Sequence, residues 1–408
     1  FGINSYQKYI LRNLSKSMPP ASKIKVAFYC FFPGGGIGQY THELLTQLMC
    51  LESLTVSLYC PPNFEWLNKA KYETHPVLFQ ISSSQPLIRK MKFLMGQWLN
   101  PNRFLHHAVK SKAHIVHFSN FNHLTYPAWK GFKTKNAPLV QACTAHDVKR
   151  AVPILNRNWE TRQLRQFYKD CRIIFVHGEN QKQELESFTG KGNYKTVIVP
   201  MGPYEFPGSQ HSQKTKFEKK DNQASKGLFF GNIRDEKNLD GLLKALSLDP
   251  ENVQLTVAGK SGISGHKSIQ YYQNLADSLG LKGKILWRDG HVPEDQVSEL
   301  FQSSDWVALP YKDKFTSQSG VFNIATHYSK PMLITPAPTF KEIFAKYSLG
   351  ELAINEGPGE MQKALKRLIQ GIKTSKYDGF QSYQDYHTWE KNAEFTQSAY
   401  QESMDPRV

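Results

Sequence analysis

The chain has 408 residues and a mass of 46.7 kDa, long enough for two or three domains. Apolar residues make up 40% of it and aromatic residues 12%, which excludes a mostly disordered chain. Lys and Arg outnumber Asp and Glu by 51 to 35, a net charge of +16. No segment approaches the roughly 20 apolar residues of a membrane-spanning helix, and the beginning lacks the apolar core of a secretory signal. We therefore expect a cytoplasmic protein with a truncated or processed start.

The five cysteines form no Cys-x-x-Cys pair and are odd in number. They predict neither a metal knuckle nor a disulfide framework, and we expect them to be reduced and mostly buried. They are Cys30, Cys50, Cys60, Cys143 and Cys171.

The first half of the chain alternates strands and helices. The apolar run Ile24–Phe31 predicts a buried parallel strand, which leads into the glycine loop Gly34–Gly38 and a helix at Tyr40–Met49. Further strands are predicted at Thr55–Tyr59, His114–Phe118, Leu139–Thr144, Ile173–Val176 and Thr196–Val199, with helices at Trp159–Tyr168 and Asn180–Phe188. This alternation predicts a doubly wound parallel sheet.

A basic stretch lies inside this half, because no acidic residue occurs between Glu73 and Asp147. Within it, Pro86–Lys112 mixes apolar and basic residues. This pattern fits an amphipathic segment on an anionic membrane surface or, equally, a core-facing helix with a solvated basic face. A nucleic-acid patch is the third reading, but no nucleic-acid motif accompanies it and we expect no such partner. The basic, amphipathic segment Tyr6–Met18 is a second surface contact or a docking helix.

A second alternating series follows a polar stretch at Tyr204–Ser225. We predict domains at residues 1–205 and 226–380, joined by a linker at 206–225. Strands or helices of the second series are predicted at Gly227–Phe230, Leu239–Ser247, Val253–Ala258, Ile269–Leu279, Lys284–Trp287, Val297–Gln302, Trp306–Pro310, Gly320–Tyr328, Pro331–Thr335 and Trp389–Met404. Two such α/β halves place ligands in a cleft at the carboxyl ends of their strands.

Two loops after strands are candidate phosphate sites. Gly34–Gly38 allows backbone N–H groups to approach an anion, although a tight turn also explains its glycines. The loop after Gly227–Phe230 carries Arg234 and Lys237, which suit a diphosphate leaving group. Alternatively, these cations pair with the neighbouring carboxylates Asp235 and Glu236.

Three further candidates follow strands in the same way. Ser317–Asn323 offers first-turn N–H groups to a phosphate, unless its serine is only a helix N-cap. His146 is a candidate acid, base or hydroxyl ligand at the end of Leu139–Thr144, although a lone histidine is more often structural. His117 has the same placement with weaker support.

In this order and spacing, the motifs resemble the GT-B glycosyltransferases, specifically the retaining nucleotide-sugar enzymes called family four or glycosyl transferases group 1. The matching segments are Gly35–Leu44, Phe229–Leu243, Leu255–Gly259, Asp289–Tyr311, Ser319–Thr335 and Trp389-Glu390, so the resemblance covers most of the chain. It implies two Rossmann-like domains facing a cleft. The first would bind the acceptor, the second the nucleotide, and a closing helix at 381–408 would pack back on the first.

The resemblance also implies roles for single residues. Arg234 and Lys237 would neutralise the leaving diphosphate, and His146 would lie near the reacting sugar. The donor would also be bound by Gly36, Gly38, Asn232, Ser319, Gly320, Val321 and Asn323. Side-chain charge would replace a metal ion, so no metal or cofactor is expected.

Two departures from the family pattern concern donor binding. The family usually carries two glutamates beside the nucleotide-binding turn, at positions that correspond here to Thr316 and Ile324. Its usual arginine corresponds to Asn232, while Arg234 lies two positions later.

The expected function is transfer of a hexose from a UDP- or GDP-linked sugar to a hydroxyl of a lipid-linked or cell-envelope glycan. We expect retention of configuration and a location on the inner face of the cytoplasmic membrane. The acceptor and membrane contacts would involve Arg89, Lys90, Lys92, Trp98 and His117. The alternatives are a soluble or protein acceptor, and a non-catalytic GT-B protein that binds sugar nucleotides or glycans.

Overall fold

The computed structural model describes most of the chain, and the predicted Tyr6–Met18 segment, nearly all of the linker, Thr316 and Ser317 lie outside the described residues. The described residues are 23–80, 85–120, 122–131, 139–150, 153–190, 192–204, 224–262, 265–315 and 318–405. The chain divides into two compact units: residues 1–144, 162–173 and 397–408 form the first, and residues 145–161 and 174–396 the second. The predicted domain boundaries stay a prediction.

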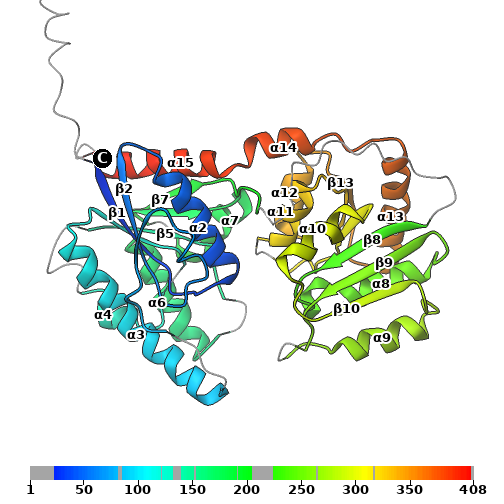
Figure 1. Ribbon diagram of the computed structural model, residues 1–408, viewed down its shortest axis with the longest axis horizontal. Helices are drawn as coiled ribbons and strands as arrows, with labels where there is room; N and C mark the ends of the chain where they lie inside the picture. The colour runs from blue at the N-terminus through cyan, green and yellow to red at the C-terminus, as the bar shows by residue number, and fades with distance from the viewer. Residues whose placement is uncertain are drawn as a thin grey trace, which may run out of the picture. The chain divides into compact units, whose positions relative to one another are not determined.

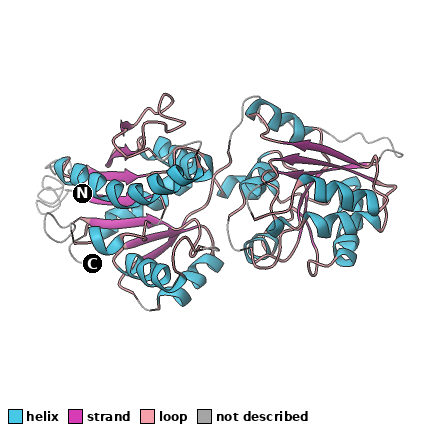
Figure 2. Cartoon of the chain, turned by 90° about the horizontal axis from the view of Figure 1, so that it is seen from below, coloured by secondary structure: helices cyan, strands magenta, loops and turns pink. Residues whose placement is uncertain are grey.

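Two parallel sheets organise the described chain (Figure 1), and Figure 2 shows helices packed around the strands of each. The first sheet has the strand order β3-β2-β1-β4-β5-β6-β7 and the second β10-β9-β8-β11-β12-β13. Both begin with the 3-2-1-4-5 order of a doubly wound fold. The predicted α/β class with two Rossmann-like sheets is confirmed.

The elements of the first half agree with the predicted strands, apart from the short edge strand β3, which was not predicted. The strands are β1 (Ile24–Tyr29), β2 (Leu54–Tyr59), β3 (Glu73–His75), β4 (Ile115–Phe118), β5 (Val140–Thr144), β6 (Ile173–Val176) and β7 (Lys195–Ile198). The helices are α2 (Gly35–Leu48), α3 (Pro86–Lys110), α4 (Tyr126–Trp129), α6 (Arg157–Lys169) and α7 (Glu179–Thr189).

The second half contains the remaining elements. Its strands are β8 (Ser225–Phe230), β9 (Val253–Gly259), β10 (Ile285–Asp289), β11 (Trp306–Leu309), β12 (Met332–Ile334) and β13 (Gly350–Leu352). Its helices are η1 (Asp235–Lys237, a 3-10 turn), α8 (Leu239–Ser247), α9 (Ile269–Ser278), α10 (Glu294–Gln302), α11 (Gly320–His327), α12 (Pro338–Phe344), α13 (Pro358–Lys373), α14 (Phe380–Tyr386) and α15 (Trp389–Ser403).

The second sheet has a hydrophobic core on each face. Successive side chains of a strand point to opposite faces, so Leu228 packs in one core cluster and Phe229 in the other. In β11, likewise, Trp306 packs in the cluster of Phe229 and Val307 in the cluster of Leu228. Both faces of this sheet are therefore covered by helices, and its carboxyl edge remains for loops that carry function.

Helix α3 continues through Pro101, which has no N–H group and cannot donate to the carbonyl of Gln97. The hydroxyl of Thr125 donates to that carbonyl instead. The preceding residue, Asn100, is fully buried, and its amide is hydrogen-bonded to both backbone groups of Phe79 (2.6 and 3.2 Å). These side chains supply the hydrogen bonds that keep the helix in place around its proline.

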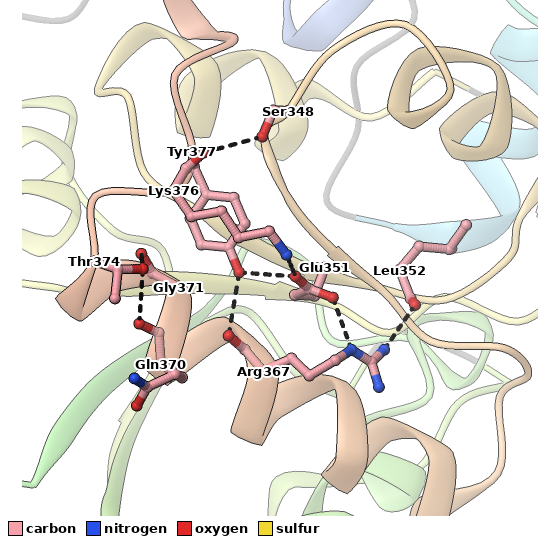
Figure 3. Close-up of polar contacts among 9 residues, drawn as sticks. All are labelled: Ser348, Glu351, Leu352, Arg367, Gln370, Gly371, Thr374, Lys376 and Tyr377. Carbon is pink, nitrogen blue, oxygen red and sulfur yellow. Dashed lines mark hydrogen bonds and ion pairs between the residues drawn. The ribbon is translucent and has the colours of Figure 1, made fainter.

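A buried carboxylate stabilises the edge of the second sheet (Figure 3). Glu351 of β13 accepts hydrogen bonds from Arg367 Nε at 2.9 Å, Lys376 Nζ at 2.6 Å and the Tyr377 hydroxyl at 3.1 Å. Burial raises the pKa of Glu351, but the hydrogen bonds from Lys376, Arg367 and Tyr377 outweigh it, so its pKa is lowered.

Replacing Glu351 by Gln is expected to lower the free energy of unfolding by about 1–2 kcal/mol at pH 7, because a neutral amide loses the charge-assisted hydrogen bonds. A carboxyl with a lowered pKa in the folded state stabilises above its unfolded pKa, and this contribution disappears as the pH falls through the folded pKa. Urea unfolding at pH 7 and pH 4 tests both expectations. Glu360→Gln is the control, because it removes an ion pair between Glu360 and the exposed Lys363 on α13. An equal loss of stability in both variants would contradict a special role for Glu351.

Candidate functional site

Lys237 is a buried lysine at the carboxyl end of β8. Its Nζ donates to the carbonyl of Phe230 at 3.0 Å and lies 5.6 Å from the centre of the Tyr311 ring. Gly231, with φ of +85°, lets the chain turn beside it, and a Cβ there would lie 3.1 Å from Nζ. Burial, and then the charge of Arg234, lower the pKa of Lys237 to about 7, although Glu236 acts in the opposite direction. An anion bound beside Nζ would favour its charged form.

Arg234 is more exposed. Its Nη1 lies 3.1 Å from Glu236 Oε1, and 45% of its side chain is accessible. Arg234 therefore pairs with a neighbouring carboxylate, as the alternative interpretation of this loop expects. Within the described part of the chain, no carboxylate lies at ion-pair distance from Lys237, so that reading fails for the lysine. Asn232, at the position of the family's usual arginine, is exposed.

The start of α11 lies beside this lysine. Ser319 is the N-cap, and its hydroxyl accepts the Phe322 N–H at 3.2 Å. The same hydroxyl lies 3.1 Å from the Tyr311 hydroxyl, and the Tyr311 ring in turn lies beside Lys237 Nζ. The backbone N–H groups of Gly320 and Val321 come before the first helical hydrogen bond, from Asn323 to Ser319. The structure therefore brings Lys237 together with the predicted phosphate-binding turn, and Ser319 is also a cap.

Asn323 and Ile324 are both buried in α11. The Asn323 amide lies 3.9 Å from the sulfur of Met201, so its predicted ribose contact would require this amide to exchange partners. Ile324, at the position of the family's second glutamate, is 6% exposed and packs in a core cluster. No carboxylate role is possible at that position.

A pocket of about 390 Å³ lies within the second unit. Asn323 and His177 line it, together with aromatic side chains of α14 such as Tyr383 and Tyr386. Arg234, Lys237 and His146 are not among its lining residues. The pocket therefore adds polar and aromatic surface beside α11 and is separate from the lysine.

His146 follows β5, and a second histidine follows the neighbouring strand β6. His177 Nε2 lies 3.1 Å from His146 Nδ1, and the two rings have centres 5.2 Å apart and planes inclined by 29°. The side chain of Gln181 joins both residues, accepting the His177 N–H and donating to the His146 carbonyl, each at 2.8 Å. His146 is thus held at the end of its strand by two partners.

The predicted glycines of the first half have different surroundings. Gly36 is exposed in the first turn of α2, where a Cβ would meet nothing within 4 Å. Gly38 is buried, and a Cβ there would lie 2.8 Å from the Trp66 ring. Gly36 fits an N–H donor in an open turn, whereas the absence of a side chain at Gly38 is explained by packing against Trp66.

Residues 210–384 match the family model described as Glycosyl transferases group 1. These residues are therefore similar to the group 1 glycosyltransferases, and the chain has the GT-B fold. No curated protein shows significant sequence similarity to it.

Solved structures share the fold of this chain at low sequence identity. A glycosyltransferase from Rickettsia africae has a TM-score of 0.68 at 15% identity, covering 95% of this chain and all of that one. Alr3699/HepE of Anabaena, solved with UDP, has a TM-score of 0.68 at 13% identity, covering 93% of this chain and 100% of that one. Sucrose-phosphate synthase from Thermosynechococcus elongatus also has a TM-score of 0.68, at 12% identity and with 93% and 99% coverage.

His117 is a core residue. It is 1% exposed, its Nδ1 lies 2.5 Å from the Tyr400 hydroxyl of α15, and its Nε2 lies 2.8 Å from Thr144 Oγ1. Burial lowers its pKa to about 3. The prediction of an acceptor or membrane contact at His117 is therefore wrong, because its ring joins α15 to β4 and β5 inside the protein.

His177 was not predicted as a site residue. It directly follows the apolar strand Ile173–Val176, which is the placement that singled out His146 after its own strand. Applying the same rule to every strand end would have found it.

The amino-terminal half of α3 is amphipathic and exposed. Leu87, Met91, Met95 and Trp98 are spaced three or four residues apart and so form one stripe, with 71% of Leu87 and 56% of Trp98 accessible. Arg89 and Lys90 are exposed and Lys92 is half-buried. The core-facing reading holds for the other end of the helix, where Phe104 and Ala108 are fully buried. Within the described residues, every helix is too short or too polar to span a bilayer.

Proposed function

We propose that this glycosyltransferase moves a hexose from a nucleoside-diphosphate sugar to a hydroxyl of a lipid-linked or cell-envelope glycan, with retention and without a metal ion. The observation that carries the donor assignment is Lys237, buried beside the first turn of α11 with no carboxylate partner among the described residues. A diphosphate there would accept from Lys237 Nζ and from the N–H groups of Gly320 and Val321. The complexes of Alr3699/HepE with UDP and with UDP-glucose support a uridine nucleotide.

In this mechanism, the side chains of Lys237 and Arg234 stabilise the charge that develops on the leaving diphosphate. Such preorganised charge accounts for a large part of the rate in transferases of this chemistry and needs no metal ion. Arg234 would exchange its contact with Glu236 for the phosphate oxygens. His146 would bind a hydroxyl of the transferred sugar.

The donor is tested by thermal unfolding of the full chain with UDP, GDP, ADP, CMP or TDP in the presence of EDTA. A ligand at 100 times its Kd adds about 2.7 kcal/mol to the free energy of unfolding, an easily measured shift in Tm. Stabilisation by one nucleotide supports the site. No stabilisation by any of them would contradict it. An NMR assignment of the product anomer then tests retention.

A non-catalytic sugar-nucleotide-binding protein is the second candidate, favoured by the burial of Ile324 at the usual glutamate position. The two candidates agree on nucleotide binding and differ in turnover. Release of free UDP from UDP-glucose, with and without a glycan acceptor, separates them, because only a transferase produces nucleotide in proportion to product.

The exposed stripe of α3 supports a membrane-bound acceptor. Apolar side chains would enter the interface between headgroups and acyl chains, while Arg89, Lys90 and Lys92 would attract anionic headgroups. A transferase placed in this way would meet a lipid-linked glycan at the inner face of the cytoplasmic membrane. A soluble or protein acceptor would need no such surface.

Replacing Arg89, Lys90 and Lys92 together by Gln is expected to weaken binding to phosphatidylglycerol vesicles by roughly 100-fold, since each charge near the surface contributes about 1 kcal/mol. Sedimentation with vesicles measures this loss. The control removes three exposed lysines of α13 (Lys363, Lys366 and Lys373), which leaves the same net charge. Equal losses in both triple variants would indicate a non-specific charge effect and contradict a membrane role for α3.

A further inference from the structure

Both ring nitrogens of His177 lie at hydrogen-bond distance from a partner, and the proposed function gives this residue no role. Its Nδ1 lies 3.4 Å from the carbonyl of Val199, and its Nε2 lies 3.1 Å from His146 Nδ1. Gln181 fixes the backbones at both histidines. The ring of His177 is therefore held between a backbone carbonyl on one side and His146 on the other.

These contacts determine where the protons are. A carbonyl only accepts, so Nδ1 of His177 carries the hydrogen in that bond. In the neutral ring, Nε2 then has only a lone pair, and the bond to His146 requires a hydrogen on His146 Nδ1. Burial lowers the pKa of His177 to about 4, although the Val199 carbonyl acts against this shift, so the ring is neutral at pH 7.

We propose that His177 is a positioning residue that holds His146 in its Nδ1–H tautomer. In this tautomer, Nε2 of His146 carries a lone pair and can accept a hydroxyl hydrogen of the transferred sugar. A hydrogen-bonded partner that sets the tautomer and orientation of a histidine is a recurring device in enzyme sites. The role in transfer rests on the proposed contact between His146 and the donor sugar, whereas the tautomer does not depend on it.

The tautomer is measured directly by two-dimensional ¹H–¹⁵N NMR of the full chain with ¹⁵N-labelled histidine, where protonated and unprotonated ring nitrogens differ widely in shift. A His146→Gln variant assigns the signals of His146. The wild type is expected to show a protonated Nδ1 and an unprotonated Nε2. A protonated Nε2 at pH 7 would overturn the proposal.

Two variants then test the role of His177. His177→Phe removes the acceptor, so the Nδ1–H pattern of His146 is expected to be lost. His177→Gln retains an acceptor oxygen and is expected to preserve it. An unchanged pattern in His177→Phe, with the Tm showing a folded protein, would overturn the proposal. If His177→Phe does not fold, loss of the pattern in His177→Gln would do so.

Kinetics connect the tautomer to the reaction. We expect His177→Phe to lower kcat about 10- to 100-fold and His177→Gln to restore most of it. Wild-type kcat in His177→Phe would overturn the positioning role. If the wild type transfers no sugar from any nucleotide donor, the proposed function fails, while the NMR measurement still decides the tautomer.

Discussion

Lys237→Met is expected to lower kcat by roughly 10²–10³-fold, the usual cost of losing one preorganised charge-stabilising donor. The same substitution should stabilise the protein without ligand. Lys237 is 8% exposed and donates only to the Phe230 carbonyl among the described residues. Replacing such a buried charge by an apolar side chain of similar length should raise the free energy of unfolding by about 1–2 kcal/mol. A functional lysine thus lowers the stability of the fold that contains it.

The stabilisation should depend on pH in a defined direction. The unfolded chain keeps the lysine proton up to its ordinary pKa near 10.5, whereas the folded protein loses it above about 7. Between these values the unfolded state binds more protons, so the stability of the wild type rises with pH. The advantage of the variant should therefore be largest below pH 7 and decrease toward pH 10.

Urea unfolding between pH 6.5 and 9.5 measures this change. Lys244→Met, at an exposed position of the following helix, is the matched control and should show neither effect. Calorimetry adds a further readout: UDP binding at pH 8 should take up about one proton in the wild type, because the diphosphate raises the pKa of Lys237, and none in the variant. Wild-type turnover in Lys237→Met would contradict the assignment.

Most of the fold could be predicted because buried parallel strands are short apolar runs. β1, β5, β6 and β8 are such runs, and the structure contains each within one or two residues of its predicted ends. β3 could not be predicted in this way. Glu73-Thr74-His75 is short and polar, and it pairs along only one edge, so its conformation depends on β2.

The candidate site could be predicted as positions but not as contacts. The rule that ligands bind at strand ends found Lys237 and His146, yet it also selected His117, whose partner Tyr400 lies 283 residues away. No local sequence pattern shows that the hydroxyl of a tyrosine in α15 will form a hydrogen bond with the His117 ring. Likewise, the sequence offers Arg234 and Lys237 as equivalent cations, and only the fold separates a buried lysine from an arginine paired with Glu236.

Arg234→Ala is expected to reduce kcat/KM by roughly 10²–10³-fold, comparable with the loss for Lys237. Unlike the substitution of the lysine, it should leave the stability of the folded protein nearly unchanged. Because the side chain is 45% accessible and its pair with Glu236 is exposed, the free energy of unfolding should change by less than about 0.5 kcal/mol. Arg234→Lys should recover only part of the activity, since an ammonium cannot reproduce the planar, bidentate contact with a phosphate.

A second variant distinguishes the two readings of Arg234. If the arginine acts only through its pair with Glu236, Glu236→Gln should be as damaging as Arg234→Ala. If the arginine binds the diphosphate, Glu236→Gln leaves the guanidinium in place and removes a competing carboxylate, so UDP should bind at least as tightly as in the wild type. Titration of UDP into both variants decides this, with Arg162→Ala on the exposed face of α6 as the charge-matched control for Arg234→Ala. Equal losses in Glu236→Gln and Arg234→Ala would return Arg234 to a purely structural role and leave Lys237 to neutralise the leaving group.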